Sequence, residues 1–170
     1  EEVYPFYGAI DVRGSSMARA RSVQADLLEQ LNLASIVINK AQEVQAFPIL
    51  KELDTRINRY KEAVTDTLRS NEEMAVYDFL QGQLLAVFEH LKETEPAVKN
   101  EITVYFSSLD PQRQYVYNHR KQYEESIARI NETLAHFADR EQLAAQKVYP
   151  HYFERFITDG LEFNMFMGQS

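Results

Sequence analysis

Apolar residues recur at intervals of three and four along most of this chain, from about Ser16 to Tyr149. This spacing collects them on one face of an α-helix, whereas a half-buried strand would alternate every second residue. The first stripe consists of Leu27, Leu31, Ala34, Ile38 and Ala41. We therefore expect an all-α fold, an up-and-down helical bundle of four to five helices.

Prolines and capping residues divide the stripes into five expected helices, because proline removes an amide donor and disfavours helix in the residue before it. Asp110-Pro111 has the form of an N-cap followed by a first-turn proline. The fifth seam loses its regularity near Asp139, so the last helix either kinks or restarts there. The expected ranges are 17–45, 48–69, 72–95, 98–109 and 112–149. The expected seam of the second helix is Leu50, Leu53, Ile57, Tyr60, Val64 and Leu68, and that of the third is Met74, Tyr77, Leu80, Leu84, Val87 and Leu91. The expected seam of the fifth helix is Val116, His119, Tyr123, Ile127, Ile130, Leu134 and Phe137.

The two ends of the chain differ from this helical middle. Residues 3–12 are rich in aromatic and β-branched side chains and favour an extended segment or short edge strand. Residues 150–156 are expected to form one or two helical turns, and 161–167 an extended segment. We expect one helical domain over 1–170, with an extended lead-in at 1–16, the bundle at 17–149 and an aromatic C-terminal segment at 150–170. Both ends are abrupt, which favours a region of a longer protein.

Composition excludes several classes of function. The 170 residues carry a formal net charge of −8 and contain no cysteine. An acidic surface repels a phosphate backbone, and a chain without cysteine has no disulfide, thiolate nucleophile or cysteine-based zinc site. No apolar run approaches the roughly 20 residues of a membrane-spanning helix. We expect a cytoplasmic protein that binds neither nucleic acid nor membrane.

Catalytic and cofactor motifs are absent from the sequence, which has neither Gly-x-Gly-x-x-Gly nor Gly-x-Ser-x-Gly. Glu132 and His136 stand four residues apart, which favours a solvated pair on a helix surface. His119 lies on an apolar seam, which favours a hydrogen-bonded core or rim histidine over a ligand. We expect no enzyme, no catalytic residue, no metal and no cofactor.

Two polar groups remain as candidates for a ligand-binding site. Arg13, Ser15, Ser16 and Arg19 surround an expected helix N-terminus, where free amides and cationic side chains bind anions. A plain capped helix start is the alternative. The second group lies among aromatic residues near the C-terminus and would line a pocket or form an aromatic lid. It consists of His151, Tyr152, Glu154 and Arg155.

The segments Tyr7–Ser16 with Asp26–Leu31, and Tyr149–Gly160 with Gly168–Ser170, resemble segments of large, poorly characterised bacterial proteins that contain GAF domains. The first segment is also similar to the closing strand and final helix of a GAF domain, although a complete GAF sheet is not found. This resemblance implies a role in signal transduction or sensing.

Two hypotheses follow from these features. The first is a non-enzymatic helical signalling module that acts through helix packing, with a second copy or adjacent domains of the same chain as partner. The alternative is a sensor for a small molecule or an anion. Its pocket would form where the two ends of the chain meet, which requires Ser16 and His151 to lie close together.

Overall fold

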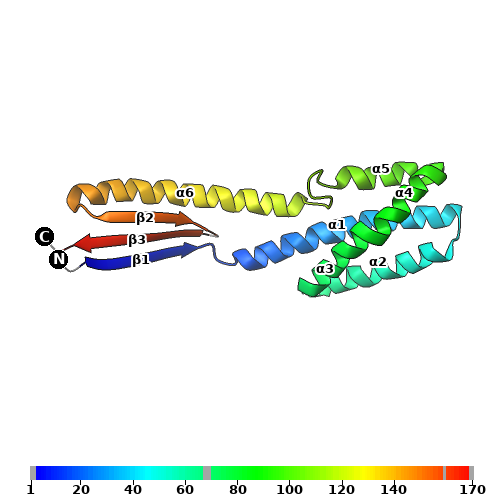
Figure 1. The fold of residues 1–170 in the computed structure, drawn as a ribbon, viewed down its shortest axis with the longest axis horizontal. Coiled ribbons are helices and arrows are strands. Elements are labelled where there is room, and N and C mark those ends of the chain that lie inside the picture. The colour runs from blue at the N-terminus through cyan, green and yellow to red at the C-terminus, as the bar shows by residue number, and fades with distance from the viewer. Residues whose placement is uncertain (1–2, 67–69, 159, 169–170) are drawn as a thin grey trace. The chain divides into compact units, whose positions relative to one another are not determined.

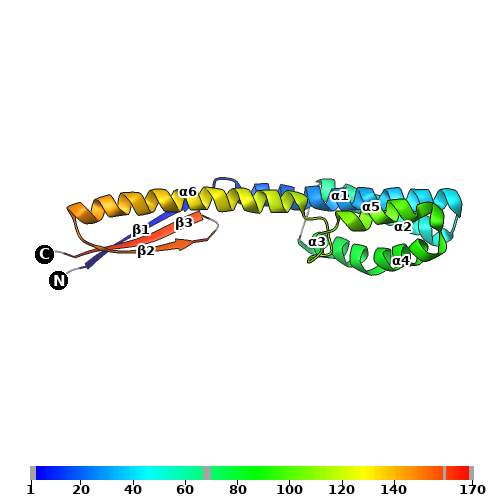
Figure 2. The ribbon, with the colours of Figure 1, turned by 90° about the horizontal axis from the view of Figure 1, so that it is seen from above.

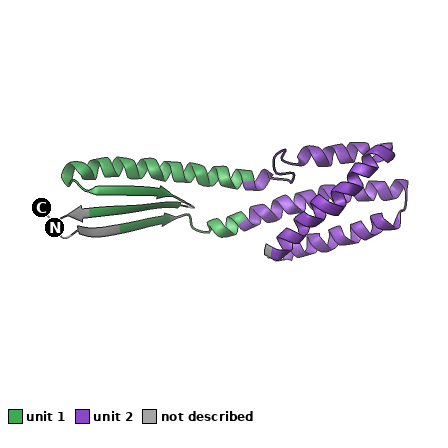
Figure 3. Cartoon of the chain, in the orientation of Figure 1, with its two compact units in different colours: residues 1–19, 121–170 green, residues 20–120 purple. Residues whose placement is uncertain are grey.

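The fold was analysed in a computed structural model, which describes residues 3–66, 70–158 and 160–168. The chain is mainly helical, as the apolar stripes predicted (Figure 1). Contacts divide it into two compact units (Figure 3). Unit 1 comprises residues 1–19 and 121–170, and unit 2 comprises residues 20–120. Most of the last helix belongs to the unit that contains the strands.

Unit 2 is helical. It contains α1 (Ser15–Val44) from Ala20 onward, α2 (Pro48–Asp66) and α5 (Lys99–Ser108), with the first residues of α6 (Asn118–Val148). Between α2 and α5 lie α3 (Ser70–Asp78), the π-helical segment η1 (Phe79–Leu84), α4 (Leu85–Thr94) and the 3-10 turn η2 (Pro96–Val98).

The stripes expected on the first two helices of unit 2 form its core. Leu31, Ala34 and Ile38 of α1 are fully buried, and so is Ile57 of α2. Truncating such a leucine or isoleucine to alanine costs about 2–5 kcal/mol, so these seams contribute much of the stability of unit 2. The sequence also predicts a helix cap at Ser70 and a turn at Asp159. These two side chains, and that of Leu68 in the expected second helix, lie outside the described residues.

The third helix differs from its expected seam. Met74, expected on the apolar face, is 64% exposed, and Val76 is fully buried in its place. The buried residues Val76, Leu80, Leu84 and Phe88 follow one another in steps of four. Each step of four drifts by about 40° around a regular α-helix. The wider π-helical turn at η1 offsets this drift and keeps the four side chains on the core.

The last helix begins later than expected. Asp110 accepts hydrogen bonds at Oδ1 from the amides of Gln112 and Arg113, at 3.0 and 2.9 Å, as a cap would. The helix does not continue from there: the following residues form turns, Gln114 has a φ of 61°, and α6 starts only at Asn118. From Asn118 it runs without interruption to Val148, so neither a kink nor a restart occurs at Asp139.

Unit 1 is built from α6 and a three-stranded antiparallel sheet. The strands are β1 (Val3–Asp11), β2 (Tyr152–Ile157) and β3 (Gly160–Gly168), in the order β1–β3–β2. The strand at the start of the chain therefore pairs with the strand at its end, with Asp11 opposite Gly160. The helical turns expected at 150–156 are wrong: β3 supplies backbone partners, and residues 152–157 form a strand on it.

Helix α6 runs along this sheet in both ribbon views (Figure 2). Arg155 of β2 contacts α6, so the sheet face that carries Arg155 is the one that faces the helix. The expected seam of α6 is wrong here, because Ile130 and Phe137 are 41% and 53% exposed, whereas Asn131 and Ala135 are buried. The sheet supplies the bulky apolar side chains, so the helix approaches it with small ones.

A glycine in β1 allows one of these bulky side chains to pack. The ring of Phe163 on β3 lies over Gly8, and a Cβ built on Gly8 would come within 2.3 Å of the ring. Only a residue without a side chain fits beneath the ring, as in aromatic coverage of strand glycines.

Candidate functional site

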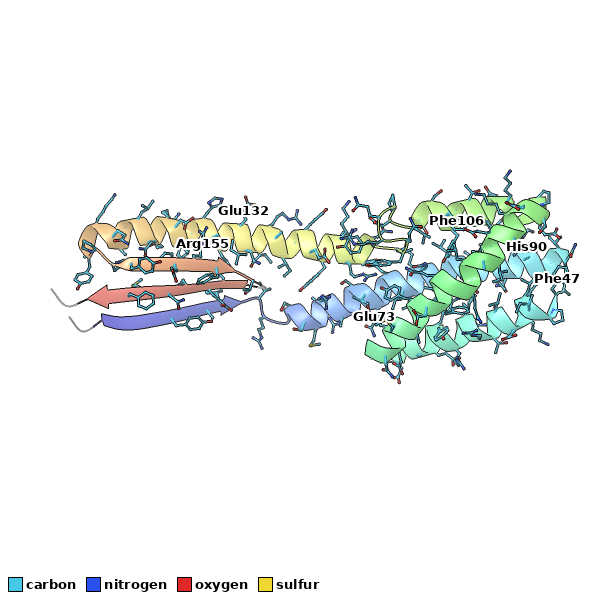
Figure 4. All side chains as sticks on the ribbon, viewed as in Figure 1. Phe47, Glu73, His90, Phe106, Glu132 and Arg155 are labelled. Carbon is cyan, nitrogen blue, oxygen red and sulfur yellow. The ribbon has the colours of Figure 1, made fainter. Side chains whose placement is uncertain are left out.

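A pocket of about 980 Å³ lies within unit 1, at the point where β1 leads into α1. Three elements form it: the first turn of α1, one face of α6, and the end of β2 with the residue that follows. Figure 4 labels two of its residues, Glu132 on α6 and Arg155 on β2. The lining residues are Ser15, Ser16, Arg19, Tyr123, Glu124, Ile127, Ala128, Asn131, Glu132, Ala135, His136, Asp139, Arg155, Ile157 and Thr158.

The first turn of α1 is held in place by local geometry. Gly14 has a φ of +75°, a conformation that glycine adopts without strain, in the short turn between β1 and α1. The amide of Ser15 donates to the carbonyl of Val12, and that of Ala18 to the carbonyl of Gly14, both at 3.0 Å. The hydroxyl of Tyr123 on α6 donates to the carbonyl of Ser15 at 3.0 Å and fixes the turn against α6.

Asn131 is a buried polar residue in the wall that α6 provides. It is 5% exposed, and its Nδ2 donates to the carbonyl of Thr158 at 3.3 Å. Its Oδ1 is buried and has no hydrogen-bond partner among the described residues. A buried acceptor without a donor costs about 1–3 kcal/mol, which most folded proteins avoid.

Arg155 enters the pocket from the opposite wall and is anchored to α6 by two groups. Its Nη1 donates to the carbonyl of Ala135 at 3.1 Å and lies 2.5 Å from Oδ1 of Asp139. This pair neutralises its own charge. Glu132 and His136 lie on the wall that α6 provides, 3.9 Å apart. Their side chains are 73% and 78% exposed, so they form the solvated pair that their spacing predicted.

The eight residues expected to bind a ligand do not form one site. Ser15, Ser16, Arg19 and Arg155 line the pocket together, although they come from opposite ends of the sequence. Arg13 is exposed and is not among the lining residues. The other three, His151, Tyr152 and Glu154, are likewise not among them.

These three residues lie at the far end of β2. Tyr152 pairs with Phe166 and Ile157 pairs with Leu161, so five residues of strand, about 17 Å, separate Tyr152 from the pocket end of β2. His151 bonds through its ring to Oε1 of Gln142 at 2.9 Å and to the carbonyl of Tyr149 at 2.6 Å. These contacts close the end of α6, so the pocket that was expected to unite Ser16 with His151 is not formed.

Sequence reasoning missed the pocket residues that α6 contributes, Asn131 and Asp139 above all. They lie beside the apolar seam that was expected to be buried, and Tyr123 and Ile127 of that seam line the pocket as well. The signal that pointed to them is a row of small residues at helical spacing, Ala128, Asn131, Ala135 and Ala138, which lets another element approach the helix closely.

A second polar cluster lies in unit 2, around the start of α6. Asp26 of α1 has a side chain that is 0% exposed, and it caps α6. Its Oδ1 accepts from the amide of His119 at 2.8 Å, and its Oδ2 accepts from the amide and the Nε of Arg120 at 3.1 and 3.0 Å. Gln30, one turn later, donates from Nε2 to the hydroxyl of Tyr105 and accepts at Oε1 from the amide of Val116.

Aromatic rings surround this cluster. The guanidinium of Arg120 lies 4.5 Å from the ring centre of Tyr115 and 5.7 Å from that of Tyr77, within the range of cation–π attraction. Burial raises the pKa of Tyr105 to about 12 and that of Tyr77 to about 12, because a phenolate would lose its hydration there. Both tyrosines are therefore neutral at physiological pH.

The cluster contains three side chains of metal-binding type, Asp26, Glu29 and His119, whose ligand atoms lie within 4.8 Å of one another. Both oxygens of Asp26 already accept hydrogen bonds, and a neighbouring arginine compensates its charge. Nε2 of His119 lies 3.6 Å from Oε2 of Glu29, an exposed rim pair. A metal would have to replace the cap of α6, so we interpret the cluster as a structural junction.

Comparison with known proteins supplies a family. A family model described as YeeD uncharacterised protein matches residues 21–134. The chain belongs to the YeeD family. The match covers nearly all of unit 2 and continues along α6 to Leu134. No curated protein and no solved structure matches the chain. Within the part of the chain that the structure describes, none of the helices combines the length and apolarity needed to cross a membrane.

Proposed function

We propose that this YeeD-family chain is a non-enzymatic sensor module that binds a small polar molecule in the pocket of unit 1. The observation that carries the proposal is the composition of that pocket. Residues from both ends of the sequence meet in it, with hydroxyls and a helix N-terminus on one side and charged groups on the other. A volume of about 980 Å³ lies at the upper end of the range of small-molecule sites.

The signalling role in this proposal rests on the resemblance of the end segments to bacterial GAF-domain proteins, and two features of the helices support it. Helices α1 and α6 both line the pocket, and each continues without a break into unit 2. There Asp26 of α1 caps α6. A ligand that shifts one helix against the other would act on two elements that this cap joins.

Nuclear magnetic resonance tests the proposal, because the chain has only 170 residues. A library of small polar compounds is screened against the labelled chain for shifts of the backbone amides of Ser15, Ser16 and Asn131. Ala128→Trp fills the pocket from an exposed position on α6 and is expected to abolish the shifts. Ala144→Trp, also exposed on α6 but not among the lining residues, is the matched control. A library without any binder, or shifts that survive Ala128→Trp, would refute the proposal.

A second candidate function is the helical interaction module, and exposed apolar residues on α6 favour it. Ile130 and Phe137 lie one above the other on the outer face of the helix, and Leu143 is 66% exposed. We propose a second copy of the chain as the partner of this face. Light scattering after size-exclusion chromatography should show a dimer that Phe137→Glu dissociates. A monomer at high protein concentration would refute it.

A further inference from the structure

The pocket of unit 1 carries both signs of charge on different walls. Two arginines and three carboxylates line it; Arg155 pairs with Asp139, and Glu132 lies 3.9 Å from His136. The carboxylates Glu124, Glu132 and Asp139 all belong to α6, whereas Arg19 and the start of α1 lie on the other wall. The carboxylates would repel a simple anion, and the positive helix N-terminus would repel a simple cation.

The wall that α1 provides suits a carboxylate. A helix N-terminus carries about half a positive charge. The amides of Ser15 and Ala18 already donate to the carbonyls of Val12 and Gly14, so those of Ser16 and Met17 are the ones that a ligand would meet. The first turn of α1 contains no acidic residue that would compensate this charge. Ser15 and Ser16 add hydroxyls at the same place, and α1 is 30 residues long, so its dipole is fully developed.

The wall that α6 provides requires a donor. Asn131 lines the pocket, is 5% exposed, and has an Oδ1 that finds no donor in the described part of the chain. Glu132 is the next residue along α6 and also lines the pocket. An ammonium group supplies the hydrogen-bond donors that Oδ1 lacks and the positive charge that the carboxylates attract.

We propose that the pocket binds a zwitterion with a free ammonium and a free carboxylate, namely a short peptide or an amino acid. The carboxylate lies at the first turn of α1, and the ammonium lies against Asn131 and Glu132. The volume favours a short peptide over a single amino acid. This inference rests on the proposed function and names the ligand class of the same pocket.

The test uses the full chain and a panel of probes. The panel contains the twenty free L-amino acids and twenty tripeptides Ala-Xaa-Ala, titrated while the amides of Ser15, Ser16 and Asn131 are followed. The tightest probe is then tested with its amine acetylated, and separately with its carboxylate converted to an amide. Each cap is expected to weaken binding at least about tenfold, the effect of losing one charge-assisted hydrogen bond.

Variants locate the two ends of the ligand. Asn131→Leu removes the unpaired oxygen at similar volume, and it should weaken the free peptide about tenfold but leave the acetylated peptide unchanged. Glu132→Gln, at a side chain 73% exposed, should weaken the free peptide without affecting folding. Glu141→Gln, exposed on α6 and not among the lining residues, is the matched control and should change nothing.

The outcomes separate this inference from the function on which it rests. If other polar compounds bind in the pocket but no member of the panel does, the zwitterion is wrong and the sensor proposal stands. If acetylating the amine and amidating the carboxylate each change the affinity by less than about threefold, the zwitterion is likewise wrong and the sensor proposal stands. If no compound of any class binds, the proposed function itself fails.

Discussion

Replacing Asp26 with asparagine should destabilise unit 2 by about 3 kcal/mol, because the carboxylate is fully buried and accepts three hydrogen bonds. Asparagine retains one oxygen, which can still accept from the amide of His119. Its NH₂ group would face two donors of Arg120, the amide and Nε, which are 3.1 and 3.0 Å from Oδ2 of Asp26. Breaking a buried ion pair typically costs about 3–5 kcal/mol, and the oxygen that remains offsets part of that loss.

Arg120→Met separates the two roles of Asp26, which caps α6 and forms an ion pair with Arg120. The carboxylate keeps its bonds to the amides of His119 and Arg120, and the positive end of α6 still stabilises its charge. We therefore expect Arg120→Met to lower the free energy of unfolding by about 1 kcal/mol less than Asp26→Asn does. The double variant should show a coupling energy of about 0.5–3 kcal/mol, the range for residues in contact.

The assay is urea denaturation followed by far-ultraviolet circular dichroism and by tyrosine fluorescence. The second probe is useful because Tyr77 and Tyr115 surround Arg120 in unit 2. Glu43→Gln on the same helix is the control: Glu43 pairs with Lys40 at 2.7 Å, but both side chains are largely exposed. Such a pair contributes about 0.5 kcal/mol or less. If Asp26→Asn costs no more than Glu43→Gln, the buried cap does not hold the start of α6.

Three further predictions concern other parts of the molecule. The free energy of unfolding should fall by about 2.8 kcal/mol per pH unit between pH 10 and 12, about 1.4 from each of Tyr105 and Tyr77, because the unfolded chain loses these protons above pH 10 while burial keeps both pKa values at about 12 in the native state. Both contributions are complete below pH 10, and Tyr105→Phe should halve the slope in urea titrations. Gly8→Val should destabilise the sheet by about 1–3 kcal/mol, since its Cβ would lie 2.3 Å from the ring of Phe163, and Phe163→Leu should relieve part of that loss in the same unfolding assay. Zinc should leave the melting temperature unchanged in differential scanning fluorimetry, because hydrogen bonds already occupy both oxygens of Asp26; a rise of several degrees would contradict this.

The helices of unit 2 could be predicted because their information is local. Leu27, Leu31 and Ile38 repeat at helical spacing, and all three are buried on the face that this spacing defines. Leu50, Leu53 and Ile57 do the same on α2. Apolar periodicity and proline positions act within a few turns of chain, so they determine which residues are helical and which face is buried.

The start of α6, its buried face and the pocket could not be predicted in the same way. A cap signal at Asp110 is present, but the residue that caps α6 is Asp26. It accepts a hydrogen bond from the amide of His119, 93 positions away in the sequence. Apolar periodicity pointed to Ile130 and Phe137 as core residues, whereas the sheet packs against Asn131 and Ala135.

The sequence by itself therefore determined the helical character of the chain, the buried faces of α1 and α2 in unit 2, and the helix N-terminus at Ser15 and Ser16. Only the tertiary structure decided that residues 152–157 form a strand, that β1 pairs with β3, and that Arg155 rather than His151 faces that N-terminus. The physical reason is range. Helix propensity and periodicity are properties of neighbouring residues, whereas the pairing of β1 with β3 and the lining of the pocket depend on contacts between segments more than a hundred residues apart.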